Sequence, residues 1–201
     1  MLIRTLCGAA VAALLVLTSA QAQQKPERVV GTIVGVDGST IVVKQRGKGG
    51  EARVSLTDKV AVYGVVRATL ADVKPGAFIG VGATPQADGS QRAIRVMIFA
   101  EVQRGAGEGH RPWNRPGTTM TNATVDTTVA GVDGQVLTVK YKGGTQKIII
   151  GKDARILAYV VGSRDELKPG ANIAINAATR RADGSLQASR VNVGRGDVQP
   201  D

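Results

Sequence analysis

Most of this chain alternates hydrophobic and polar residues with a period of two, which is the pattern of a half-buried β-strand. In residues 39–46, for example, Ile41 and Val43 fall on one face while Lys44 and Arg46 fall on the other. The same pattern predicts ten short strands, five in each half of the chain. They cover 28–36, 39–46, 51–57, 77–84 and 91–99, and then 124–132, 135–142, 145–150, 171–179 and 186–193.

Asp-Gly pairs separate several of these strands and predict tight hairpins. A type I′ turn needs positive φ at both central residues, and Asp-Gly is the pair that supplies it most readily. The carboxylates could also be taken for calcium ligands, but they lack the dense spacing of a calcium loop. We therefore interpret all four pairs as turns: Asp37–Gly38, Asp88–Gly89, Asp133–Gly134 and Asp183–Gly184.

The strand pattern is written twice, which indicates an internal repeat. Four motifs of the first half return 94 to 96 residues later: Val36-Asp37-Gly38, Lys74-Pro75-Gly76-Ala77, Ala87-Asp88-Gly89-Ser90 and Ala93-x-Arg95-Val96. We expect each copy to close its own barrel. The predicted division is a first repeat at 28–102, a linker at 103–122, a second repeat at 123–194 and a tail at 195–201.

One segment in each repeat breaks the strand pattern. Residues 163–170 combine a Ser/Glu capping box with a Pro-Gly stop and predict one or two helical turns, and 69–76 is a weaker version. Five strands with a short helix between the third and fourth is the element order of an OB-type barrel. Gly35 and Gly131, inside the first strand of each copy, are suited to a bend or bulge.

The inward positions of the predicted strands define an aliphatic core for each copy. In the first copy these are Val29, Ile33, Ile41, Val43, Val54, Leu56, Ile79, Val81 and Val96. In the second copy they are Val125, Val129, Leu137, Val139, Ile148, Ile150, Ile173, Ile175 and Val191. The fold class predicted is all-β, with two tandem five-stranded OB-like barrels.

The succession Val-Asp-Gly, strand, Lys-Pro-Gly, Ala-Asp-Gly-Ser and Ala-x-Arg-Val resembles a bacterial exported family catalogued as a domain of unknown function. The resemblance covers both repeats. It implies small OB-like β-barrels, often in tandem, and an exported protein, but no established activity. Chains with this kind of linker are also similar to ones labelled as metal-transport components.

The first 22 residues have the features of a secretory signal peptide. Arg4 gives a positive start, the apolar run 6–18 follows, and Ala20-Gln21-Ala22 matches a signal-peptidase site. The run is shorter than the roughly 20 residues that span a membrane, although a retained N-terminal anchor is the alternative. Cleavage near Ala22 would remove the single cysteine, Cys7, and release the chain into the periplasm without a transmembrane span.

The side-chain inventory argues against several classes of function. One histidine and one cysteine exclude zinc fingers and thiol enzymes, and no Ser/His/Asp arrangement marks a catalytic site. We expect no enzyme, no cofactor and no metal site, since His110, Met120 and Glu108 would make at most three mixed ligands. Six aromatic residues are few for a single-strand nucleic-acid binder, which stacks successive bases on rings.

Basic residues are in excess, with 26 Lys and Arg against 16 Asp and Glu. Many lie on the second and third strands of each repeat, which carry the binding face of many OB-folds. They could bind an anionic polymer or an acidic protein, or they could simply form a solvated face that blocks edge pairing. The candidates are Lys44, Arg46, Lys48 and Arg53, then Lys140, Lys142 and Lys147, and Arg180 and Arg181 beside the last hairpin.

The linker holds the only histidine and the only tryptophan, among glycines and prolines that predict neither helix nor strand. It could be a ligand clasp, with Trp113 stacking on a ring and Arg111 and Arg115 binding an anion. It could instead be a strap in which Trp113 plugs the seam between barrels, with His110 nearby.

Taken together, the sequence predicts an exported, non-catalytic binding or scaffold protein of the cell envelope. A periplasmic metal-handling accessory protein and an OB-type nucleic-acid binder are the alternatives.

Overall fold

The computed structural model describes residues 25–47, 49–131 and 134–200, and it is built almost entirely of β-strands. The predicted signal peptide, 1–22, lies outside the described residues. The strands are β1 (Glu27–Asp37), β2 (Thr40–Gln45), β3 (Glu51–Arg67), β4 (Phe78–Pro85), β5 (Gln91–Ile98), β6 (Gly109–Pro112), β7 (Thr119–Gly131), β8 (Gly134–Tyr141), β9 (Gly144–Gly151), β10 (Arg155–Val161), β11 (Asn172–Arg180) and β12 (Leu186–Gly194). Three 3₁₀ turns join them: η1 (Leu70–Asp72), η2 (Glu101–Gln103) and η3 (Arg164–Glu166).

The first barrel closes through strands from both ends of the chain. β1, β2 and β3 form an antiparallel meander, β11 pairs with β1, and β12 pairs with β11 and, in parallel, with β3. The interior is aliphatic because the inward positions of all five strands are Val, Ile, Leu or Ala, and Leu167 after η3 packs against it.

The second barrel has the same arrangement but occupies a continuous stretch of sequence. β7, β8 and β9 form the meander, β4 pairs with β7 and β5, and β5 closes the ring through a short parallel pairing with β9. The core runs from Val73, next to η1, to Ile150. The all-β class and the five-stranded barrels with short helical turns are therefore confirmed.

The assignment of each barrel to one repeat is wrong. Repeat 28–102 gives β1–β3 to the first barrel and β4–β5 to the second, and repeat 123–194 divides in the same way. The second barrel is thus an insertion within the first. The physical reason is that β3 does not turn back after residue 57 but runs on to Arg67, which carries the chain to the other barrel.

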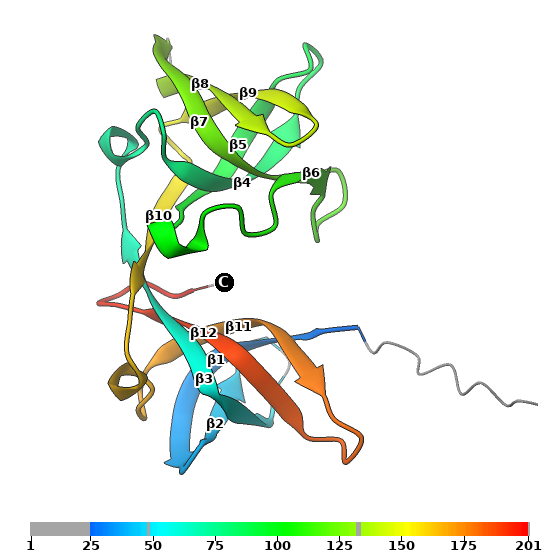
Figure 1. Ribbon diagram of the computed structural model, residues 1–201, viewed down its shortest axis with the longest axis vertical. Coiled ribbons are helices and arrows are strands. Elements are labelled where there is room, and N and C mark those ends of the chain that lie inside the picture. Colours follow the sequence, from blue (N-terminus) through cyan, green and yellow to red (C-terminus); the bar gives the residue numbers. More distant parts are fainter. Residues whose placement is uncertain (1–24, 48, 132–133, 201) are drawn as a thin grey trace, which may run out of the picture.

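Two strands bridge the barrels, as Figure 1 shows at mid-height. The second half of β3 pairs antiparallel with β10, from Tyr63 with Val161 to Arg67 with Leu157, and Val65 faces Tyr159 at the centre. Residues 65 and 159 are 94 positions apart, which is also the offset between η1 and η3. The bridge therefore lies on an approximate two-fold axis that relates the two repeats.

Side-chain alternation predicts the core well, with one exception. Seventeen of the eighteen expected core residues are buried, but Val129 is 62% exposed. A register shift between Val125 and Thr127 turns the rest of β7 over, so that Val129 lies opposite the outward Val136. The corresponding shift in β1 falls between Ile33 and Gly35, as expected for that glycine, and Gly131 has no such role.

The hairpin turns are present, but not as type I′. Gly38, Gly89 and Gly184 have positive φ, whereas no described residue other than a glycine does, so the described aspartates keep ordinary backbone angles. Asp88 instead accepts hydrogen bonds from the backbone N–H and the hydroxyl of the serine two residues later, and so does Asp183. These bonds lower the pKa of both carboxyls. The third pair includes Asp133, which lies outside the described residues.

Candidate functional site

The outer faces of the two barrels join into one curved sheet face. Partners across a strand pair project to the same side, and the register aligns two rows. One row is Val30, Ala174, Asn192, Tyr63 and Val161, and the other is Leu157, Met97, Gly80, Asn122 and Gly109. Both rows meet in β10, since Val161 and Leu157 are four residues apart, so the face is continuous from β1 to β6.

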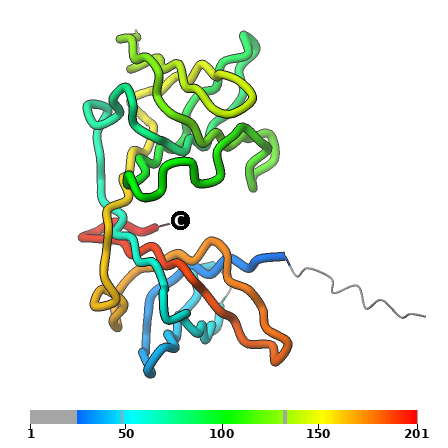
Figure 2. The backbone as a smooth tube through the Cα atoms, viewed as in Figure 1, coloured from blue at the N-terminus to red at the C-terminus, as the bar shows by residue number. Residues whose placement is uncertain are grey.

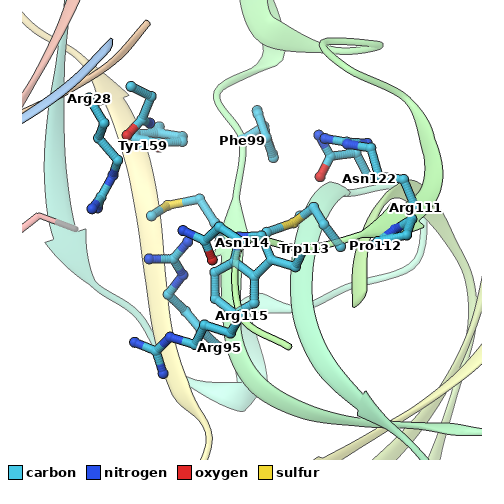
Figure 3. Close-up of a pocket in the computed structure, with 14 residues that line it drawn as sticks. Arg28, Arg95, Phe99, Arg111, Pro112, Trp113, Asn114, Arg115, Asn122 and Tyr159 are labelled. Carbon is cyan, nitrogen blue, oxygen red and sulfur yellow. The ribbon is translucent and has the colours of Figure 1, made fainter. Parts of the chain in front are cut away.

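A cavity of about 490 Å³ lies on this face, between the barrels. That volume is within the range of small-molecule sites. β1, β11 and β10 contribute Arg28, Asn176 and Tyr159; β4 and β5 contribute Gly80, Arg95 and Met97; and Phe99, Arg111, Pro112, Trp113, Asn114, Arg115, Met120 and Asn122 complete the lining. Figure 3 shows Trp113 near the middle, with Arg28 and Arg111 on opposite sides of it.

Two outward glycines of β4 make room for the aromatic rings. A Cβ on Gly82 would lie 2.5–2.9 Å from three atoms of the Trp113 ring, and a Cβ on Gly80 would lie 2.8 Å from Phe99. Any larger residue would push the rings away. Trp113 is half-buried, with the guanidinium carbons of Arg95 and Arg115 5.2 and 5.7 Å from its ring centroid. Trp113 is therefore part of the cavity wall rather than a buried plug.

The linker is more ordered than its glycines and prolines predict. Residues 109–112 form β6, which pairs with the start of β7, so the prediction that the linker contains no strand is wrong. Figure 2 shows this segment, in green, on the side of the second barrel that faces the first. We call residues 99–118 the strap. Its strand, β6, is held against β7 by sheet pairing.

Side-chain bonds hold the strap from both ends. His110 Nδ1 lies 2.8 Å from Thr121 Oγ1, and its ring stacks on Tyr141. The Glu108 carboxylate accepts a hydrogen bond from the Lys142 backbone N–H, and Arg104 donates to the Gly76 carbonyl. His110 is therefore an anchor of the strap and does not line the cavity, whereas the other three clasp candidates do.

The cavity is strongly cationic. Four of its lining residues are arginines, and none of the lining residues that the structure describes is an Asp or Glu. Arg28, Arg111 and Arg115 are exposed, and Arg111 donates one hydrogen bond to the Gly107 carbonyl. Guanidinium groups offer several N–H donors in a fixed plane, which suits carboxylate, sulfate or phosphate oxygens.

One buried amide, that of Asn122, adds to the polar side of the wall. Asn122 is 7% exposed and donates through Nδ2 to the Ala106 carbonyl, while its Oδ1 has no hydrogen-bond partner within the described residues. A buried acceptor without a donor is costly, and the usual remedies are water or a ligand N–H or O–H group.

The basic residues predicted on the strand faces are spread apart. Lys44, Arg46 and Arg53 belong to β2, β3 and the turn between them, and Lys140, Lys142 and Lys147 to β8, β9 and their turn, near the two ends of the molecule in Figure 1. Lys48 lies outside the described residues. The two sets therefore do not form one surface.

Carboxylates also accompany several of these basic residues. Lys44 is opposite Glu51 across the strand pair, Lys140 is 2.8 Å from Asp126, and Arg180 is 2.6 Å from Glu27. Arg46 donates instead to the side-chain oxygen of Asn172, at 3.4 Å, and Arg181 is exposed close to Asp183. Neighbouring opposite charges weaken the field that these faces project.

Sequence reasoning missed two arginines that the repeat itself marks. Arg95 and Arg190 occupy the same place in the repeated Ala-x-Arg-Val motif, on the outward side of β5 and β12. Arg95 lies over Trp113, and Arg190 lies 4.7 and 5.1 Å from the rings of Tyr63 and Tyr159. An arginine kept at an outward position in both copies was the available signal.

Other kinds of site find no support in the described part of the chain. No group of three His, Cys, Asp or Glu there could hold a metal ion. No described helix is long and apolar enough to cross a membrane. In comparisons with known proteins, no family model, curated protein or solved structure matches this chain.

Proposed function

We propose that this protein is an exported, non-catalytic binding protein that holds an anionic ligand of the cell envelope in the cavity between its barrels. The observation that carries the proposal is the lining of that cavity, where four arginines converge and the described lining residues include no Asp or Glu. Guanidinium–anion hydrogen bonds are stronger than neutral ones.

The cavity supports anion binding better than the strand faces do. On those faces Lys44, Lys140 and Arg180 each have a carboxylate opposite or in contact. In the cavity, the arginines surround a ring, Trp113, that the glycine at 82 and the anchored strap hold in place. A site whose shape exists before binding loses less entropy on binding.

The compartment and the absence of catalysis are part of the proposal. The charged start, apolar run and Ala-x-Ala motif at 1–22 support export to the periplasm. Among the described residues, the lining offers arginines, amides and rings but no carboxylate or thiol to act as a nucleophile or general base. Such a set of side chains favours the binding of an anion over catalysis.

The test uses the chain from residue 23 onward and inositol hexakisphosphate, a compact anion, with uncharged inositol as its control. The cavity variant is Arg28→Gln/Arg115→Gln. The matched variant, Lys44→Gln/Arg53→Gln, removes the same charge from the strand face. By calorimetry we expect the cavity variant to bind the phosphate at least about tenfold more weakly, since each charged hydrogen bond contributes about 1.5–3 kcal/mol.

The matched variant should bind within about threefold of the unaltered chain, because exposed charges at a distance are screened. Equal losses in the two variants, a larger loss in the matched variant, or no binding by the unaltered chain would each contradict the proposal.

A further inference from the structure

The cavity has an apolar floor in addition to its cationic rim. Met97, which is 7% exposed, Phe99 and Met120 come from β5, the residue after it and β7. They converge because Met97 pairs with Gly80 and Met120 pairs with Gly82 across the sheet. The two glycines let the Phe99 and Trp113 rings lie close against the sheet beside these side chains, so the hollow is lined by sulfur and ring carbons.

This apolar part offers contacts that a highly hydrated anion bound at the arginines would not use. A phosphate or a sulfated sugar carries polar groups over its whole surface and would leave Met97, Phe99 and Met120 without matching contacts. Methionine and aromatic side chains instead favour an apolar body, because thioethers adapt their shape and contact rings well.

The charged groups lie around this floor. Arg28 comes from the first barrel, and Arg111 and Arg115 come from the strap on the second barrel. In Figure 3 they lie in different directions from the Trp113 ring, so a guanidinium stands at more than one edge of the floor. The three are exposed, which keeps this rim open to an entering ligand.

Building on the proposed function, we propose that the ligand is a small amphipathic organic anion, with an apolar body on the methionine and phenylalanine floor and an acidic group at the arginine rim. A volume of about 490 Å³ suits one such molecule rather than a polymer chain. The body would lie beside Trp113, and the apolar area that it buries would add to the charged contacts.

Three probes separate the two parts of the ligand: 2-naphthalenesulfonate, uncharged 2-naphthol and inorganic sulfate. Trp113 is the only tryptophan in the chain, so its fluorescence reports the cavity directly, and calorimetry gives the affinity. We expect the naphthalenesulfonate to bind at least about tenfold more tightly than either of the other two probes, since only it uses both the floor and the rim.

Two variants test the floor itself. Met120→Gln keeps the length of the side chain but makes it polar, and we expect naphthalenesulfonate to bind at least about fivefold more weakly, with inositol hexakisphosphate unaffected. Met120→Leu keeps an apolar side chain and should bind within about twofold of the unaltered chain.

The outcomes distinguish this inference from the proposed function. If sulfate and naphthalenesulfonate bind equally, and Arg28→Gln/Arg115→Gln weakens both, the cavity binds anions but the inference about the apolar body is wrong. If 2-naphthol binds as tightly as the sulfonate, or the arginine variant binds the sulfonate normally, the proposed function fails with it. Binding of none of the probes overturns both.

Discussion

Cutting the chain at the repeat boundary should give a different result from cutting it at the barrel boundary. The fragment 25–102 is one complete sequence repeat, whereas 68–158 contains one complete barrel with parts of both repeats. The second fragment keeps every buried residue of its core, from Val73 to Ile150. The first keeps only halves of two different cores.

The cost to the repeat fragment can be estimated from the first core. Seven Val, Ile and Leu side chains of β1–β3 lose the strands β11 and β12 that cover them. If each becomes half-exposed, the loss is roughly 5–10 kcal/mol, taking about 1.5–3 kcal/mol for full burial of one such side chain. That equals most of the roughly 5–15 kcal/mol by which a domain is stable.

We therefore expect 25–102 to be unfolded, or to be a dimer in which two copies exchange β4 and β5, and never a folded monomer. We expect 68–158 to be a folded monomer. Light scattering during gel filtration gives the mass, and circular dichroism with a thermal scan reports folding. A folded monomer of 25–102 together with an unfolded 68–158 would refute the division into barrels described above.

Four single substitutions test other parts of the structure. Gly82→Ala should displace the Trp113 ring, shift its fluorescence emission to longer wavelength and weaken naphthalenesulfonate binding about tenfold. The melting temperature should stay within a few degrees of that of the unaltered chain. Unchanged emission would contradict the packing of Trp113 against Gly82. Trp113→Ala should remove most naphthalenesulfonate binding but lower the free energy of unfolding by less than about 2 kcal/mol, because the ring is only half-buried. A greater loss of stability with intact binding would mean that Trp113 has only a structural role. Val125→Thr should destabilise the protein by about 1–3 kcal/mol and Val129→Thr by less than about 0.5 kcal/mol, because only Val125 is buried. Urea unfolding measures both values. Similar values for the two substitutions would mean that β7 has no register shift.

The hydrogen bonds of Glu166 make the stability of the protein depend on pH. Its carboxylate accepts hydrogen bonds from Arg195 and from the Ser163 N–H, and these lower its pKa. Its contribution to stability is therefore present above the unfolded pKa of about 4.3 and is lost as the pH falls through the lower folded pKa. The difference in urea midpoint between the unaltered chain and Glu166→Gln should shrink from pH 6 to pH 3, and a constant difference would contradict this role.

Sequence pattern predicted the strands and the core because both depend on local alternation. Ile41 and Val43 are inward in β2 for the same reason that Leu137 and Val139 are inward in β8. Val129 was misplaced because a one-residue register shift reverses the alternation, and nothing in the residues 125–127 marks where the shift falls.

The exchange between repeats could not be predicted from the repeats themselves. The strands β4 and β5 of the first copy and β11 and β12 of the second copy can take the same place in a barrel, since their inward residues are alike. Only the path of the chain between residues 57 and 70 decides which barrel each pair of strands completes. The extension of β3 to Arg67 commits the chain to the second barrel. The cavity depends on this exchange, because the bridge of β3 and β10 brings Arg28 and Tyr159 to the same hollow as Trp113.

The candidate site was only partly visible in the sequence. The sequence marks Arg111, Trp113 and Arg115 because the linker holds the single tryptophan. Arg28 and Arg95 lie far from it in sequence and meet it only through the sheet register. The basic residues on the strands indicate the outer faces instead, where carboxylates such as Asp126 offset them.

The most direct test of anion binding between the barrels is an NMR titration that follows the arginine side-chain Nε–Hε signals as 2-naphthalenesulfonate is added. We predict that the signals of Arg28, Arg111 and Arg115 shift together and saturate at one equivalent, while those of Arg53 and Arg181 stay unchanged. Shifts confined to Arg53 and Arg181, with the cavity arginines unaffected, would contradict the account.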